Sequence, residues 1–253
     1  MKYIGCQTIT WGDMHQEHIE KVFREIKKAG YDGIEIGARR LDYEKSNYYK
    51  KLLANYNLKL VGLHIGGDYL NKKLVKKRRK NLKNKIELTN YLNGEFIFIS
   101  GLYKENKSLE DYKIEANNYN QIGKMCRKNE ITLCYHNHNW EFENNLTGFN
   151  ILIEQTDSEN LGFVPDVGWI THAGVNPAKI IKKIYNRVKA IHFKEFTKGS
   201  NFTELGKGVV DFQRIYEVIK DKNDFWIVAE QDQTHKTPFE SAKNNCQFIQ
   251  NII

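Results

Sequence analysis

The chain has 253 residues, of which 40% are hydrophobic and 28% are charged, a composition that suits a protein with a substantial core in water. Its longest apolar runs, such as residues 96–99, are too short to cross a bilayer, and no charged-then-apolar leader precedes the first strand-like segment. The four cysteines lack paired spacing and are expected to be reduced. We therefore expect a cytoplasmic protein that has no membrane partner.

The net charge of +8 is concentrated in one segment, residues 72–85. Such a segment could bind nucleic acid, but Leu74, Val75, Leu82 and Ile86 recur in it at helical spacing, and no aromatic residues alternate with its charges. The pattern favours a long helix with a buried stripe and a solvated basic face. We expect no nucleic-acid partner.

Strand-like and helix-like patterns alternate along the chain without an internal repeat or a flexible linker. The predicted strands are 3–9, 32–37, 58–65, 95–100, 131–137, 161–165, 188–193 and 225–230. The predicted helices are 16–29, 45–56, 71–92, 109–129, 148–156, 176–186, 211–221 and 239–252.

Eight strand–helix units in this length predict a single (β/α)₈ barrel domain over residues 1–253. A doubly wound open sheet is the alternative, but the first strand is followed by no G-x-G-x-x-G turn. Local signals agree with the predicted boundaries. Gly30 suits a helix end, Ser108 and Asp211 suit helix N-caps, and Pro177 suits a first helical turn.

Four side chains that can bind a metal follow four successive predicted strands: Glu141, Asp166, His192 and Glu230. The intervals between them are 25, 26 and 38 residues, roughly one strand–helix unit each time. In a barrel of parallel strands, all four would point into the same carboxyl-terminal end. Three carboxylates converging on one place would repel each other, and a divalent metal ion between them is the simplest remedy.

Several segments carry a resemblance to a known family. They are residues 135–142 (YHNHNWEF), 166–169 (DVGW), 173–177 (AGVNP), 191–194 (IHFK), 204–212 (ELGKGVVDF) and 230–232 (EQD). Together they resemble the xylose isomerase-like barrels of the sugar phosphate isomerase/epimerase superfamily, which also holds ketose 3-epimerases and inosose dehydratases. The resemblance extends over nearly the whole chain.

This resemblance implies one divalent metal ion, most often Mn²⁺, with Zn²⁺, Co²⁺, Fe²⁺ and Mg²⁺ as alternatives. The implied ligands are Glu141, Asp166, His192 and Glu230, and the two glutamates would also act as the acid/base pair. A small carbohydrate substrate is implied too, and dimers or tetramers are common in the family.

The chemistry that we expect is isomerisation or epimerisation of a small sugar or keto-sugar, by proton abstraction next to a carbonyl and through a metal-stabilised enediolate. Lys194, His138 and His64 are candidate donors to the oxyanion, because each stands just after a predicted strand. Further candidate substrate-binding residues at the same rim are Trp11, Glu35, Trp140, Trp169 and His172.

Three other functions stay open. Ketose 3-epimerases have a histidine three residues after the aspartate ligand, where this chain has Trp169, and the nearest histidine is His172. This departure leaves room for an inosose dehydratase-like lyase that shares the metal site. A nuclease resembling endonuclease IV would need more metal ligands than the sequence offers, and a binding barrel without catalysis would need none.

The sequence leaves open whether the substrate carries a phosphate group. Lys194, Lys198 and Lys207 lie near the last two predicted strands, where barrels often bind phosphate, but these lysines could equally be surface charges. On balance the pattern slightly favours an unphosphorylated sugar, polyol or keto-sugar.

Overall fold

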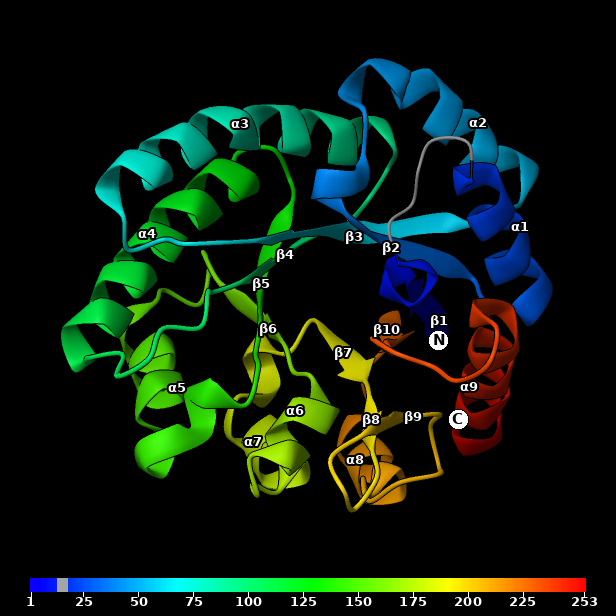
Figure 1. The fold of residues 1–253 in the computed structure, drawn as a ribbon. Helices are drawn as coiled ribbons and strands as arrows, with labels where there is room; N and C mark the ends of the chain where they lie inside the picture. Colours follow the sequence, from blue (N-terminus) through cyan, green and yellow to red (C-terminus); the bar gives the residue numbers. More distant parts are fainter. Residues whose placement is uncertain (13–17) are drawn as a thin grey trace.

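The computed structural model describes residues 1–12 and 18–253, which contain one eight-stranded parallel sheet with helices around it (Figure 1). The order around the sheet is β6-β5-β4-β3-β2-β1-β10-β7. Its strands are β1 (Lys2–Gln7), β2 (Gly33–Gly37), β3 (Lys59–Gly66), β4 (Phe96–Ser100), β5 (Thr132–His136), β6 (Gly162–Val164), β7 (Ala190–Phe193) and β10 (Phe225–Ala229).

The two edges of this sheet, β6 and β7, meet and nearly close the barrel. Parallel bridges join Phe163 to Val188 and Asp166 to His192. Between them, the backbone N–H of Lys189 donates to the Phe163 carbonyl at 3.0 Å, and that of His192 donates to the Pro165 carbonyl at 2.9 Å. The predicted (β/α)₈ barrel is therefore confirmed, and the open doubly wound sheet is wrong.

Helices cover the outside of the barrel (Figure 1). They are α1 (Ile19–Ala29), α2 (Ser46–Asn55), α3 (Lys72–Tyr91), α4 (Leu109–Arg127), α5 (Glu143–Gln155), α6 (Val167–His172), α7 (Pro177–Lys183), α8 (Phe212–Ile219) and α9 (Pro238–Ile252). The predicted caps are present, since the side chains of Ser108 and Asp211 accept hydrogen bonds from Asp111 N–H and Arg214 N–H. Within the described residues, no helix is long and apolar enough to cross a membrane.

The sequence-based boundaries differ from the structure in several places. Residues 16 and 17 of the first predicted helix lie outside the described residues. The first strand ends at Gln7, because a 3₁₀ helix, Thr8–Trp11, follows directly. Helix α6 and the short hairpin of β8 (Glu195–Phe196) and β9 (Phe202–Thr203) were not predicted, since such short elements carry little periodic signal.

Other boundary differences lie in the helices. Helix α5 begins five residues before the predicted 148 and contains three residues, 144–146, with left-handed backbone angles. Leu74, which was expected in the buried stripe of α3, is exposed, whereas Val75, Leu82 and Ile86 are buried as predicted.

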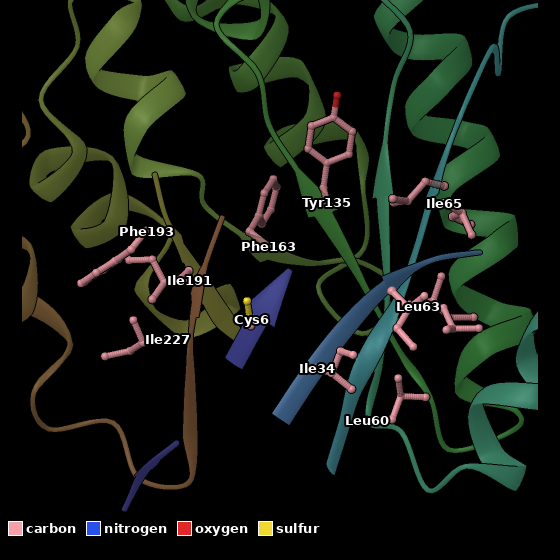
Figure 2. Packing of buried hydrophobic residues seen from close by; sticks show 14 of the residues in the cluster. Cys6, Ile34, Leu60, Leu63, Ile65, Tyr135, Phe163, Ile191, Phe193 and Ile227 are labelled. Atoms are coloured by element: carbon pink, nitrogen blue, oxygen red, sulfur yellow. The ribbon is translucent and has the colours of Figure 1, made fainter. Parts of the chain in front are cut away.

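Two hydrophobic layers hold the barrel together. The outer layer packs the strands against the helices and includes Tyr135, Phe163 and Ile191, which Figure 2 shows along β5, β6 and β7. The inner layer fills the barrel itself and consists of Val61, Phe96, Phe98, Cys134, Val164, Ala190, Trp226 and Val228. Neighbouring residues such as Cys134 and Tyr135 belong to different layers, because successive side chains of a strand point to opposite faces.

Gly123 of α4 allows that helix to approach the turn before β6 closely. A Cβ atom at this position would lie only 1.9 Å from the backbone oxygen of Asn160. An alanine normally favours a helix over glycine by about 1 kcal/mol. Here the clash is with backbone rather than with a flexible side chain, so we expect overpacking to outweigh that gain.

We predict that Gly123→Ala lowers the free energy of unfolding by about 1–3 kcal/mol. The matched control is Asn117→Ala, an exposed position of the same helix, which should leave stability nearly unchanged. Urea unfolding followed by circular dichroism measures both variants. An unchanged or higher midpoint for Gly123→Ala would contradict the close approach of α4 to Asn160.

Candidate metal centre

Four buried side chains that can bind a metal meet at the carboxyl ends of four neighbouring barrel strands. They are His136 at the end of β5, Asp166 after β6, His192 in β7 and Glu230 after β10. One ligand atom of each lies within 4.8 Å of the others. The structure thus brings together three of the four predicted ligands and adds His136.

The alternation of the strands explains why these four side chains converge. Each stands two residues after a member of the inner layer, and therefore points into the barrel like that residue. The inner-layer residues in question are Cys134, Val164, Ala190 and Val228. The layer of side chains above the apolar interior therefore contains all four candidate metal ligands.

The atoms of this group are close enough to share one ion. His136 Nε2 lies 3.1 Å from Glu230 Oε2 and 3.4 Å from Asp166 Oδ2, and His192 Nδ1 lies 2.6 Å from the same Glu230 oxygen. The Asp166 Oδ1 atom accepts from Trp169 N–H, whereas its Oδ2 is buried and makes no hydrogen bond. Two imidazoles and two carboxylates, one with an oxygen that makes no hydrogen bond, fit a first-row divalent metal.

Glu35 lies against the His192 ring and forms an ion pair with it. Its Oε2 lies 2.7 Å from His192 Nε2, the ring nitrogen that faces away from Glu230, and its Oε1 lies 2.9 Å from His64 Nδ1. His64 Nε2 in turn lies 3.2 Å from Ser100 Oγ. Glu35 is fully buried and does not line the pocket, so its position suits support of a candidate ligand, and its predicted substrate contact stays a prediction.

Lys194 balances the carboxylates of the group. Its Nζ lies 3.3 Å from Asp166, 3.2 Å from Glu230 and 2.6 Å from Asp232. Burial alone would lower the pKa of Lys194, but these carboxylates raise it above its usual value. Burial also works against ionised Glu230, yet Lys194 and His136 hold the pKa of Glu230 well below its usual value. The two groups therefore stay ionised in spite of their burial.

The histidines of the group respond to the same carboxylates. Burial opposes their charged forms, but Glu230 and Asp166 raise the pKa of His136, and Glu35 and Glu230 raise the pKa of His192 to about 10. Without a metal, the His192 imidazole would carry a proton at neutral pH, and the pKa of the His136 imidazole is shifted in the same direction. A metal ion would take the place of protons on these rings, so metal binding should release them.

Glu141 does not belong to this group of four candidate ligands. Its carboxylate accepts hydrogen bonds from the Tyr135 hydroxyl at 2.8 Å and from the His138 backbone N–H at 2.6 Å. Burial raises its pKa to about 7 in spite of these bonds. Glu141 does not line the pocket and instead holds the turn after β5, which carries His138 and Trp140.

The sequence did contain a signal for His136. It follows the inner-layer residue Cys134 by two positions, just as His192 follows Ala190. The prediction chose Glu141 because it follows a predicted strand and because the family resemblance implies a glutamate as the first ligand, although Glu141 lies beyond the strand end and within a 3₁₀ helix. Counting the alternation to the end of the strand would have selected His136.

A pocket of about 730 Å³ opens above the group, and His136 and Glu230 form part of its lining. His64, His138, Trp140 and Asp232 line it as well. The His138 ring stacks on Trp140 with 4.2 Å between centroids, and burial lowers the pKa of His138 well below its usual value, so this imidazole is neutral. Because His136 and Glu230 line the pocket, a ligand bound in it could contact the group of candidate metal ligands.

Three aromatic residues predicted to contact substrate do not line this pocket. The indole N–H of Trp11 donates to Glu25 at 2.6 Å. Trp169 and His172 pack around Phe196 of the β8–β9 hairpin, with ring centroids 5.0 and 4.8 Å from it. These side chains support the surrounding loops, so only His64 and Trp140 of the predicted substrate-binding residues face the pocket.

The chain is a TIM barrel with a group of buried histidine and carboxylate side chains at its carboxyl-terminal end, which is where TIM barrels place their active sites. Residues 23–252 match the model of a family described as xylose isomerase-like TIM barrel. The chain belongs to that family.

Known proteins with similar sequences or structures are named as enzymes or metal-binding proteins. An inosose dehydratase of Clostridium beijerinckii is 24% identical over 97% of this chain and 94% of its own length. A D-allulose 3-epimerase from Methylomonas sp., solved with D-allulose, shares the fold with a TM-score of 0.82 and 20% identity, covering 99% and 97% of the two chains. The IOLI protein, solved with a zinc atom, has a TM-score of 0.80 and 15% identity, covering 99% and 97%.

We predict that Glu35→Gln weakens metal binding by about 10- to 100-fold, because His192 loses the carboxylate that orients its ring. Competition against a chromophoric chelator gives the dissociation constant. Glu20→Gln, which changes a carboxylate at an exposed position of α1, is the matched control. Equal metal affinity in the wild type and both variants would show that Glu35 does not support the centre.

Proposed function

We propose that the protein is a divalent-metal-dependent enzyme that isomerises or epimerises a small sugar or keto-sugar by removing a proton next to its carbonyl. The observation that carries this proposal is the group of four buried candidate ligands, two of which, His136 and Glu230, line a pocket large enough for a sugar. The cytoplasmic location, the single domain and a homo-oligomeric state stay predictions.

In this proposal the ligands are His136, Asp166, His192 and Glu230, with His136 in the place that the sequence analysis gave to Glu141. Mixed nitrogen and oxygen ligands suit Mn²⁺, and they suit Zn²⁺, Co²⁺ and Fe²⁺ as well, so Mn²⁺ stays a prediction. The metal, when bound, would supply Lewis-acid polarisation of the substrate carbonyl and its neighbouring hydroxyl.

The acid/base chemistry falls to side chains that line the pocket. Glu230 is ionised and reaches the pocket, so we assign it the removal of the proton. Neutral His138, held by its stacking on Trp140, is the second proton carrier. Lys194 is buried behind Glu230 and Asp232, where its charge keeps Glu230 ionised and favours negative charge developing on the substrate.

A dehydratase is the second candidate, because curated relatives that span the full chain are named inosose dehydratases. The reaction would begin with the same proton removal and continue with loss of a hydroxyl group as water. Trp169 stands where ketose 3-epimerases have a histidine, and it does not line the pocket, which also favours this candidate. The endonuclease-like and non-catalytic alternatives make different predictions for metal content.

The first test is metal content, measured by plasma emission on protein purified without chelator. We predict close to one metal per chain in the wild type and in Glu141→Gln, and loss of metal in His136→Gln and in Asp166→Asn. Loss of metal in Glu141→Gln, together with retention of metal in His136→Gln, would support the ligand set that the sequence predicts. Three metals per chain would support the nuclease, and none, even after Mn²⁺ is added, would support the binding barrel.

The second test is proton exchange into a panel of ketoses and keto-inositols in D₂O, followed by NMR, with mass spectrometry to detect loss of water. We predict that His138→Gln keeps its metal but slows exchange by roughly 10²-fold, because a general acid/base typically contributes that much. Exchange without water loss indicates isomerisation, and water loss indicates the dehydratase. Unchanged exchange in His138→Gln would remove His138 from the mechanism.

A further inference from the structure

The pocket has a cationic wall that the proposed reaction does not use. Arg39, which follows β2, and Arg78 and Lys85 of α3 all line it. No ion pair in residues 1–12 and 18–253 involves any of the three, whereas the acidic lining residues Glu230 and Asp232 are both paired with Lys194. The pocket therefore has acidic groups at the metal end and uncompensated positive charge elsewhere.

Arg78 is built into this wall by the loop that follows β3. Its Nη1 donates to the Gly66 carbonyl at 3.0 Å, and its buried Nε has no hydrogen-bond partner. A Cβ atom on Gly67, whose φ is +144°, would lie 2.2–2.4 Å from Cζ, Nη2 and Nη1 of the Arg78 guanidinium. A glycine at 67 thus leaves the space in which the guanidinium lies, with donors left over for a ligand.

Lys85 lies two helical turns after Arg78 on the same helix and lines the same pocket. Burial, and then the nearby charge of Arg78, lowers the pKa of Lys85. Two partly buried cations on one pocket wall repel each other, and an anion that contacts both would reduce that cost. The arrangement is unfavourable when the pocket holds only water and favourable when it holds an anionic group.

A short chain of contacts joins this wall to the metal centre. Arg78 bonds the carbonyl of Gly66, and Gly66 pairs with Ser100 in the sheet. Ser100 Oγ lies 3.2 Å from His64, whose ring centroid lies 5.0 Å from that of the proposed ligand His136. His64, Gly66 and Ser100 all line the pocket, so one ligand could reach from one end to the other.

We propose that the substrate carries an anionic group, a phosphate ester or a carboxylate, which Arg78 and Lys85 bind together with Arg39 at the end of the pocket away from the metal. This inference rests on the proposed function for the other end of the same pocket. It narrows the proposed substrate class from sugars in general to acidic sugars. It places the binding site for the anionic group on the segment after β2 and on α3. The lysines after β7 that the sequence suggested for phosphate are not needed, and Lys194 is already paired with carboxylates.

Calorimetric titration of the Mn²⁺-loaded protein tests this proposal with four probes: inorganic phosphate, D-fructose 6-phosphate, D-fructuronate and D-fructose. We expect inorganic phosphate to bind, and at least one of the two acidic sugars to bind ten-fold or more tightly than D-fructose. Arg78→Met and Lys85→Met should each weaken binding of the anionic probes by about ten-fold or more. The affinity of these two variants for D-fructose should equal that of the wild type.

Lys76→Met and Lys80→Met are the matched controls, since both remove a positive charge from exposed positions of the same helix. They should leave all four affinities unchanged. Thermal unfolding checks that each variant is folded, and Arg78→Lys should recover part of the lost affinity because it restores the charge. Preference for the phosphate ester identifies phosphate as the anion, and preference for the uronate identifies carboxylate.

Failure to bind inorganic phosphate, equal affinity for charged and neutral sugars, or equal losses in the control variants would overturn the proposal. Metal content measured on the same preparations separates this result from failure of the proposed function. If the wild type contains metal but does not bind the anionic probes, only the proposed anion site is refuted. A wild type without metal refutes the proposed reaction, and the anion site is then judged on inorganic phosphate and its loss in Arg78→Met.

Discussion

The alternation of side chains along eight parallel strands is the constraint on which the whole centre depends. The same alternation that sends Cys134, Val164, Ala190 and Val228 into the barrel sends the side chain two positions later into the layer above. Apolar residues can fill a closed barrel, but the layer at its mouth is free to be polar. Shifting one of these strands by a single residue would replace its ligand by a side chain of the outer layer.

Burial makes that polar layer costly unless its charges compensate each other. Glu35 and Glu230 share His192 between them, and Lys194 is surrounded by Asp166, Glu230 and Asp232. The group is therefore a network of opposite charges that a metal would join by taking the place of protons. Arg78 and Lys85 differ from this pattern, because they stand in the pocket wall without a carboxylate to balance them.

Much of the fold was predictable from the sequence, because repeated strand–helix units give a strong periodic signal. Asp166, His192 and Glu230 could be found for the same reason, since each stands just after or within a recognisable strand. His136 was missed because the family resemblance implied a glutamate as the ligand after this strand, and Glu141 was the glutamate that followed it. The cationic wall was missed because the charges of α3 look alike in sequence, and only packing separates Arg78 and Lys85 from the solvated lysines beside them.

The seam between β6 and β7 has a consequence for stability. It is the least extensively bonded junction of the barrel, and one of its bridges joins Asp166 to His192, two of the proposed ligands. An ion held by both residues would also tie the two edges of the sheet together. An ion that binds only the closed barrel stabilises that state by mass action. Metal binding and closure of the barrel would then be thermodynamically coupled. The protein would then resist unfolding and proteolysis most strongly in its metal-bound form, which is also the form that the proposed reaction requires.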